Sequence, residues 1–201
     1  MISAYFAQNL QKILQKRGIA FIVDEVQTGY LATGKMWGLE HWNLPTPPDF
    51  VTVSKKMMQG AVYTHKKFIP TLPYRHYNTW FGDMARMSML AAQNEVVQKE
   101  NLAKNVEASG EVLMNGFQAL AKRFPNLFRR PRGLGTFLAF DVAEDTGKRN
   151  HLLQRMKEKG VYVGMCGDYS VRLRPSLYFL PEHARIFLET LGSVLEEMES
   201  S

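Results

Sequence analysis

The chain has 201 residues, of which 45% are hydrophobic and 22% charged. This is a globular composition, and it excludes a disordered or collagen-like chain. The single cysteine, Cys166, excludes an internal disulfide framework and a multi-cysteine metal site. The formal net charge of +6 suits small anionic molecules. The dense basic run at residues 129–132 is too short to predict nucleic-acid binding, and no apolar run approaches the roughly 18 residues of a membrane span.

The first 23 residues form a basic, amphipathic segment with no acidic residue before Asp24. Gly18 stands where a glycine commonly ends a helix. Apolar residues recur before it at helical spacing, namely Tyr5, Phe6, Leu10, Ile13 and Leu14. We therefore predict a structural helix that ends near Gly18, and the alternative is an organelle presequence.

Two short apolar runs predict buried strands in the first half of the chain. Ile19–Val23 is apolar on both faces, as parallel strands are, and Asp49–Val53 is the second run. We expect two or three parallel-type strands here. Ligands of α/β sheets bind at the carboxyl ends of such strands. Asp24 and Lys55 follow these two runs, so each is either a functional residue or an ordinary solvated side chain.

The rest of the chain predicts helices and strands in a different order. A helical pattern runs from Asp83 to Phe124 and is longer than usual, with possible interruptions at Gly110 and Gly116. Further strands are expected at Gly135–Asp141, Val161–Val163 and Ser170–Arg174, and further helices at Arg149–Lys159 and from Pro181 onward. This order predicts an α/β first half and an α+β second half.

Other candidate residues lie in the second half. Arg172 and Arg174 alternate with apolar residues, so both are expected on one strand face. They form either a solvated edge or a fork that binds a carboxylate. The Gly133–Gly135 pair precedes a strand rather than a helix, so it predicts a bend and not a phosphate-binding loop. The histidines lack metal-ligand spacing, and we predict no metal site.

Two segments taken together carry a family resemblance. Residues 21–29 and 49–55 resemble the two-part signature of the class III pyridoxal-phosphate-dependent aminotransferases, with the spacing that the signature requires. Gln59 departs from it, because a small residue is preferred there. Further motifs resemble the 4-aminobutyrate aminotransferases of this class: residues 34–37, 40–42, 54–58, 74–75, 78–80, 132–137, 166–168 and 172–175.

The resemblance covers essentially the whole chain, but only the C-terminal part of the longer family polypeptide. It implies the α/β fold of the fold type I transferases that use pyridoxal phosphate. Residues 1–104 would be the later part of the cofactor-binding large domain, including a long connecting helix. Residues 105–201 would be the small α+β domain. The family's phosphate-binding loop lies outside these residues, so we do not expect catalysis by this chain alone.

The resemblance also implies roles for single residues toward the cofactor, pyridoxal 5′-phosphate. Lys55 would hold it covalently and Asp24 would pair with its protonated ring nitrogen. Val26 would pack on the ring and Gln27 would reach its phenolic oxygen. Thr79 would contact the cofactor phosphate of a neighbouring subunit.

Arg172 would bind the carboxylate of the substrate. The implied reaction moves the amino group of 4-aminobutyrate to 2-oxoglutarate, so the partners are small amino and oxo acids. The resemblance further implies a homodimer in the mitochondrial matrix. Two alternatives stay open: a transaminase for another ω-amino acid, such as an ornithine-type enzyme, or a non-catalytic truncated product that associates with a full-length subunit.

Overall fold

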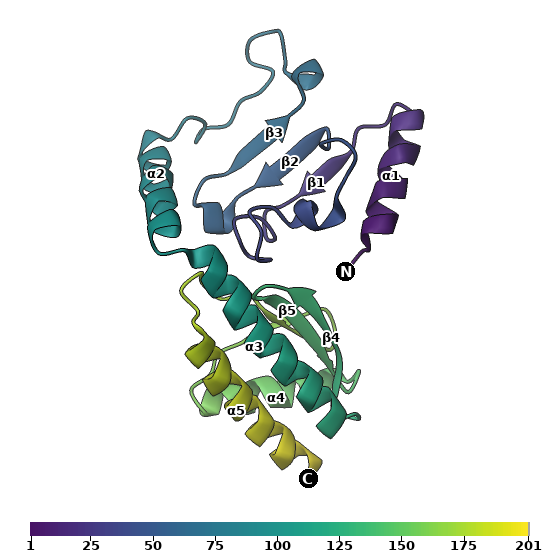
Figure 1. Cartoon of the computed structure of the whole chain (residues 1–201), viewed down its shortest axis with the longest axis vertical. Coiled ribbons are helices and arrows are strands. Elements are labelled where there is room, and N and C mark those ends of the chain that lie inside the picture. The colour runs from purple at the N-terminus through teal and green to yellow at the C-terminus, as the bar shows by residue number, and fades with distance from the viewer. Residues whose placement is uncertain (201) are drawn as a thin grey trace. The chain divides into compact units, whose positions relative to one another are not determined.

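The computed structural model describes residues 1–200 and divides into two compact units (Figure 1). The N-terminal unit comprises Ile2–Leu31 and Lys35–Asn101. The C-terminal unit runs from Leu102 onward and includes Met1 and Ala32–Gly34. The assignment of residues 1–104 and 105–201 to the two family domains stays a prediction.

Helix α1 (Ala4–Lys16) opens the N-terminal unit and ends as the sequence predicts. Gly18 has a φ of +65°, which glycine adopts without steric cost. The Gly18 amide donates to the Gln15 carbonyl at 3.1 Å, and the Ile19 amide donates to the Leu14 carbonyl at 2.9 Å. These two hydrogen bonds are the pattern by which a glycine terminates a helix, so the predicted helix is confirmed.

The sheet of the N-terminal unit has the strand order β1-β2-β3. Strands β1 (Ile22–Asp24) and β2 (Phe50–Val53) are parallel, as predicted. Strand β3 (Ala61–Thr64) is antiparallel to β2, so the unit has two parallel strands, the lower of the two numbers expected. The connection over residues 54–60 is too short for a parallel crossover, which needs a dozen or more residues.

Three short 3₁₀ helices complete the turns of this unit. They are η1 (Gly38–Trp42), η2 (Lys55–Met57) and η3 (Lys66–Phe68). The second of these begins directly where β2 ends, and it holds the candidate lysine.

The predicted long helix is two helices, α2 (Met84–Lys99) and α3 (Leu102–Arg123). The break lies at Asn101, whose φ is +49°, and not at Gly110 or Gly116, so that part of the prediction is wrong. Asparagine tolerates this left-handed conformation better than most residues.

The two glycines inside α3 serve close packing instead. A Cβ atom added at Gly110 would lie 2.3 Å from the carbonyl oxygen of Gly135. One added at Gly116 would lie 2.4 Å from a methyl carbon of Leu188. Neither position has room for a larger side chain unless a neighbour moves.

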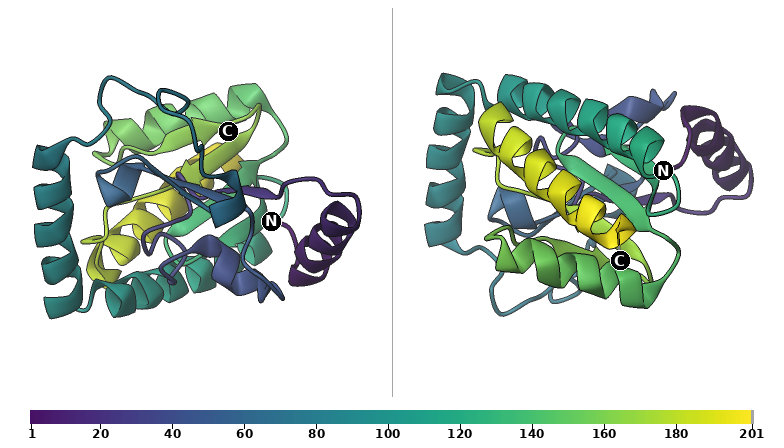
Figure 2. Two further views of the ribbon diagram at one scale, coloured as in Figure 1. Left: turned by 90° about the horizontal axis from the view of Figure 1, so that it is seen from above. Right: turned by 90° about the horizontal axis from the view of Figure 1, so that it is seen from below.

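The C-terminal unit is a four-stranded antiparallel sheet with helices on one face (Figures 1 and 2). Its strand order is β4-β5-β7-β6. The strands are β4 (Phe128–Leu134), β5 (Phe137–Val142), β6 (Gly164–Cys166) and β7 (Ser170–Leu173). Helices α4 (Thr146–Glu158) and α5 (Pro181–Glu199) confirm the two predicted helices.

One predicted strand in this unit is misplaced. The strand expected at residues 161–163 is β6, three residues later, where Cys166 pairs with Ser170 of β7. Val161 and Val163 instead pack against the core of the unit. The predicted glycine bend is confirmed, because Gly135 lies in the turn between β4 and β5, two residues after Gly133 of β4.

The core of the C-terminal unit lies between this sheet and α3, α4 and α5. Aromatic rings fill its centre. The Phe128 and Phe140 rings stack with centroids 4.3 Å apart, and Phe117 contacts both of them and Phe187. One face of the sheet is thus apolar, and polar residues of the strands are left for the other face.

Candidate functional site

Asp24 closes β1 and carries an oriented carboxylate. Its Oδ1 accepts hydrogen bonds from the Val26 amide at 2.9 Å and from the Thr52 hydroxyl at 3.0 Å. Among the described residues nothing donates to its Oδ2, and the side chain is exposed. The carboxylate is therefore fixed through one oxygen, while the other can accept a bond from a bound molecule.

Lys55 lies at the same edge of the sheet as Asp24. The parallel register pairs Asp24 with Thr52, and Lys55 follows three residues later. Both residues therefore stand at the carboxyl ends of neighbouring parallel strands, where α/β sheets bind ligands. Lys55 is exposed and has a φ of +52°. Such a backbone angle is uncommon outside glycine, and strained residues of this kind cluster at functional sites.

The turn that holds Lys55 is anchored through its neighbour. The Gln93 side chain of α2 donates a 2.6 Å hydrogen bond to the Lys56 carbonyl. The two lysines differ in exposure, because Lys56 is partly buried and Lys55 is exposed. Sequence reasoning missed Gln93, since nothing in the local pattern connects it with a turn 37 residues earlier.

Glu25 is a buried carboxylate that fixes the loop after β1. It is 2% exposed and accepts hydrogen bonds from the Leu39 amide at 2.6 Å, the Gly38 amide at 3.1 Å and the Thr28 hydroxyl. Asp24 and Glu25 are adjacent, and one is exposed while the other is buried. The sequence shows two acids in succession after a buried strand, but it does not indicate that Glu25 is the buried one.

Val26 and Gln27 follow Asp24 directly, and both are partly buried. The N-terminal unit thus brings Asp24, Val26, Gln27 and Lys55 to the carboxyl ends of β1 and β2. Thr79 is in the same unit, within residues 69–82, all of which are exposed. Its contact with a neighbouring subunit stays a prediction.

Arg172 belongs to the C-terminal unit and lies in the middle of β7. Val171 and Leu173 are buried in the core, so Arg172 points to the opposite face of the sheet. It is partly buried, and its guanidinium has no hydrogen-bond or ion-pair partner among residues 1–200. Arg174 lies one residue beyond the end of the strand.

A buried carboxylate lies on the same sheet face as Arg172. The Asp141 side chain is 3% exposed and binds the Arg132 guanidinium through two bonds of 2.9 and 3.0 Å. Arg130 Nε donates at 2.6 Å, and the Ser170 hydroxyl also donates. Burial alone would raise the pKa of Asp141, but the bonds from Arg132 and Ser170 outweigh it and the pKa is lowered. No local pattern in the sequence marks Asp141 as a candidate.

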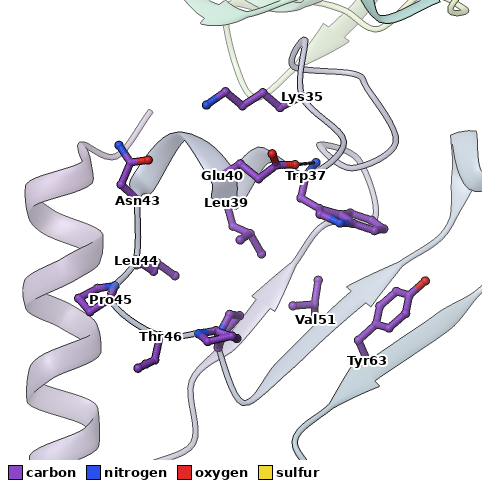
Figure 3. A pocket seen from close by; sticks show the side chains of 12 residues that line it. Lys35, Trp37, Leu39, Glu40, Asn43, Leu44, Pro45, Thr46, Val51 and Tyr63 are labelled. Atoms are coloured by element: carbon purple, nitrogen blue, oxygen red, sulfur yellow. Dashed lines mark hydrogen bonds between the residues drawn. The ribbon is translucent and has the colours of Figure 1, made fainter. Parts of the chain in front are cut away.

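A cavity of about 690 Å³ lies on the other face of the β1–β3 sheet. Figure 3 shows the loop of residues 35–48 and the side chains of Val51 and Tyr63 around it. Val51 and Tyr63 are paired across β2 and β3, whereas Asp24 is paired with Thr52. Because neighbouring residues of a strand point to opposite faces, this cavity is separate from the Asp24 carboxylate.

Residues 1–200 contain neither a metal-binding cluster nor a membrane-spanning helix. No group of three histidine, cysteine, aspartate or glutamate side chains is arranged to hold a metal ion. Among these same residues, no helix combines the length and the apolar character that crossing a membrane requires.

Comparison with known proteins agrees with this arrangement. The family model described as aminotransferase class-III matches residues 1–195. The mitochondrial 4-aminobutyrate aminotransferases of Sus scrofa and Homo sapiens are each 42% identical over 194 residues, 96% of this chain and 39% of the relative. The 4-aminobutyrate aminotransferase of Saccharomyces cerevisiae is 42% identical over 200 residues. The chain therefore spans about two fifths of the length of these relatives.

Solved structures show the same fold. The chain resembles a lysine aminotransferase from M. tuberculosis in its internal aldimine form, with a TM-score of 0.91 and 26% identity, over 97% of this chain and 46% of that one. An S-selective transaminase from Arthrobacter sp. shares the fold with a TM-score of 0.88 at 23% identity, over 100% of this chain and 49% of that one. These likenesses confirm the predicted α/β fold as part of a fold type I transferase. The chain belongs to the class III aminotransferase family.

Proposed function

We propose that this chain supplies the lysine, the aspartate and the carboxylate-binding arginine of a pyridoxal-phosphate-dependent aminotransferase that acts on 4-aminobutyrate and 2-oxoglutarate. The observation that carries the proposal is the placement of Asp24 and Lys55 at the ends of two adjacent parallel strands. The 42% identity to relatives named 4-aminobutyrate aminotransferase supports the choice of substrate over an ornithine-type one.

The residues at this edge of the sheet fit pyridoxal 5′-phosphate. Asp24 offers an open carboxylate oxygen on an already oriented side chain, which suits a cationic N–H donor such as a protonated ring nitrogen. Lys55 offers an exposed primary amine, which suits an aldehyde. When bound, the cofactor supplies a ring that takes up the electron pair left by a departing substrate proton.

Asp24 has the task of holding a proton at the ring nitrogen. A charge-assisted hydrogen bond contributes about 1.5–3 kcal/mol, equal to roughly 1–2 pKa units in favour of the protonated ring. The Thr52 hydroxyl and the Val26 amide occupy Oδ1 and so leave Oδ2 for this bond. Val26 and Gln27, held in place after β1, would contact the ring and its phenolic oxygen.

Lys55 has two tasks, to hold the cofactor and to move a proton. Its amine is the group that would take a proton from the substrate carbon and return it. Such a task requires an amine within reach of the substrate carbon. The hydrogen bond from Gln93 to the Lys56 carbonyl anchors the backbone of η2, from which the Lys55 side chain extends.

Arg172 would bind the substrate carboxylate, because a guanidinium without a partner can donate two parallel hydrogen bonds to a carboxylate. We further propose a homodimer, supported by the exposed apolar side chains Tyr74, Tyr77, Trp80, Phe81 and Met84. A mitochondrial location is proposed from the mammalian relatives, whose names include it.

The test uses a family-length protein, in which this sequence replaces the matching segment of the Sus scrofa relative. The family-length protein, supplied with cofactor, should form glutamate and succinate semialdehyde in equal amounts from 4-aminobutyrate and 2-oxoglutarate. Asp24→Asn should lower its kcat roughly 10- to 100-fold, the size of one charge-assisted bond. Near-normal turnover in Asp24→Asn, or transfer from ornithine only, would contradict the proposal.

A further inference from the structure

The outer face of the C-terminal sheet carries three arginines around one carboxylate. Arg130 and Arg132 of β4 both bind Asp141 of β5, whereas Arg172 of β7 binds no side chain among residues 1–200. An irregular register between Arg129 and Arg132 allows Arg130 and Arg132 to reach the same acid, because the extra residue of a bulge redirects the side chains around it.

Arg172 stands close enough to Asp141 to compete for it. The register pairs Asp141 with Ser170, and Arg172 is two residues further along the same strand face. Diagonal neighbours of this kind in an antiparallel sheet are about 7–8 Å apart, which a long side chain can span. Arg132 lies on the other side, since Ala139 pairs with both Arg132 and Arg172.

Arg132 holds the stronger position toward this carboxylate. Its guanidinium makes two bonds to Asp141 and a third to the Ser170 hydroxyl at 3.1 Å. A bidentate pair of this geometry is the strong form of an arginine–carboxylate contact. Arg130 makes a single bond through Nε and is 53% exposed, so its contribution is smaller.

We propose that Arg132 is a positioning residue that occupies Asp141 and thereby leaves Arg172 available for a substrate carboxylate. This inference rests on the proposed function only in naming the ligand of Arg172. Without Arg132, Arg172 pairs with Asp141, and a substrate carboxylate must then displace the Asp141 carboxylate from Arg172.

The competition between Arg132 and Arg172 for Asp141 is tested on the 201-residue chain itself, without cofactor or substrate. Phenylglyoxal modifies arginine side chains, and mass spectrometry of peptides gives the rate at Arg172. Arg132→Met should slow this modification about two- to fivefold, the size expected for a partly exposed ion pair. The double variant Arg132→Met/Asp141→Asn should restore the original rate, because the competing charge is gone.

The matched control is Arg130→Met, which removes an arginine from the same acid but leaves the bidentate pair intact. In this variant, phenylglyoxal should modify Arg172 at the same rate as in the parent chain. Circular dichroism and thermal unfolding accompany each variant. An unchanged Arg172 rate in Arg132→Met, or a double variant as slow as the single one, would overturn the proposal, since loss of structure alone predicts no rescue.

The consequence for substrate is tested separately in the family-length protein. Arg132→Met should raise KM for 2-oxoglutarate with little change in kcat, and the double variant should return KM toward its original value. The rates of Arg172 modification can follow the predicted order while neither the family-length protein nor any of its variants transfers amino groups. In that case the proposed function fails and the positioning role of Arg132 stands. A fall in kcat without a change in KM would contradict that role.

Discussion

Asp24 and Thr52 lie opposite each other on two parallel strands, and the Thr52 hydroxyl donates a 3.0 Å hydrogen bond to the Asp24 carboxylate. The Val26 amide donates to the same oxygen. The orientation of the acid is therefore set by a strand neighbour from 28 residues later and by the turn that follows it.

Thr52→Val should remove one of these two bonds while keeping the shape of the side chain. We expect kcat of the family-length protein to fall about three- to tenfold, because a hydrogen bond to a charged group contributes on the order of 1 kcal/mol or more. Thr52→Ser keeps the hydroxyl and should retain most of the turnover. Equal losses in the two variants would show that the hydroxyl does not orient Asp24.

Asp141→Asn should destabilise the C-terminal unit at neutral pH by about 1–3 kcal/mol, because two arginines and Ser170 lose a charged acceptor. The pKa of Asp141 is lowered in the fold from 3.8, so its contribution is present above that value and is lost as the pH falls through the lower folded pKa. Urea unfolding at several pH values measures this.

The difference in unfolding free energy between the parent chain and Asp141→Asn should therefore disappear below about pH 4. Glu189→Gln changes an exposed acid and should shift the unfolding free energy by less than about 0.5 kcal/mol at any of these pH values. A gap that widens on acidification would mean that Asp141 is not held as an anion.

Gly110→Ala and Gly116→Ala test the packing of α3. Both gain about 1 kcal/mol in helix propensity, but overpacking costs roughly 1–3 kcal/mol. At Gly110 the new methyl group meets the rigid Gly135 backbone, whereas at Gly116 it meets the Leu188 side chain. We expect Gly110→Ala to lower the stability and Gly116→Ala to leave it nearly unchanged, as measured from urea midpoints. The reverse order would contradict this packing.

The sequence predicted the elements whose patterns are local. The helix ending at Gly18 and the helix opened by Pro181 each carry their own termination or start signal, and the structure has both. The break at Asn101 and the antiparallel direction of β3 were not predicted. The first rests on a single left-handed residue, and the second depends on how short the connection from β2 is.

The site shows the same division between local and distant contacts. Asp24 and Lys55 became candidates because they follow two apolar runs, and the family resemblance then gave each of them a role. Thr52, Gln93 and Asp141 were missed, since their roles depend on partners 9 to 37 residues away. Only strand register or helix packing brings such partners together.

The most direct test of the account is to find which lysine binds the cofactor. The family-length protein is incubated with pyridoxal 5′-phosphate, reduced with borohydride so that the link becomes permanent, and digested for mass spectrometry. We predict the pyridoxyl group on Lys55, its loss in Lys55→Ala, and an unchanged yield in Lys56→Ala. Labelling of Lys56 or another lysine, with Lys55 unmodified, would contradict the central claim.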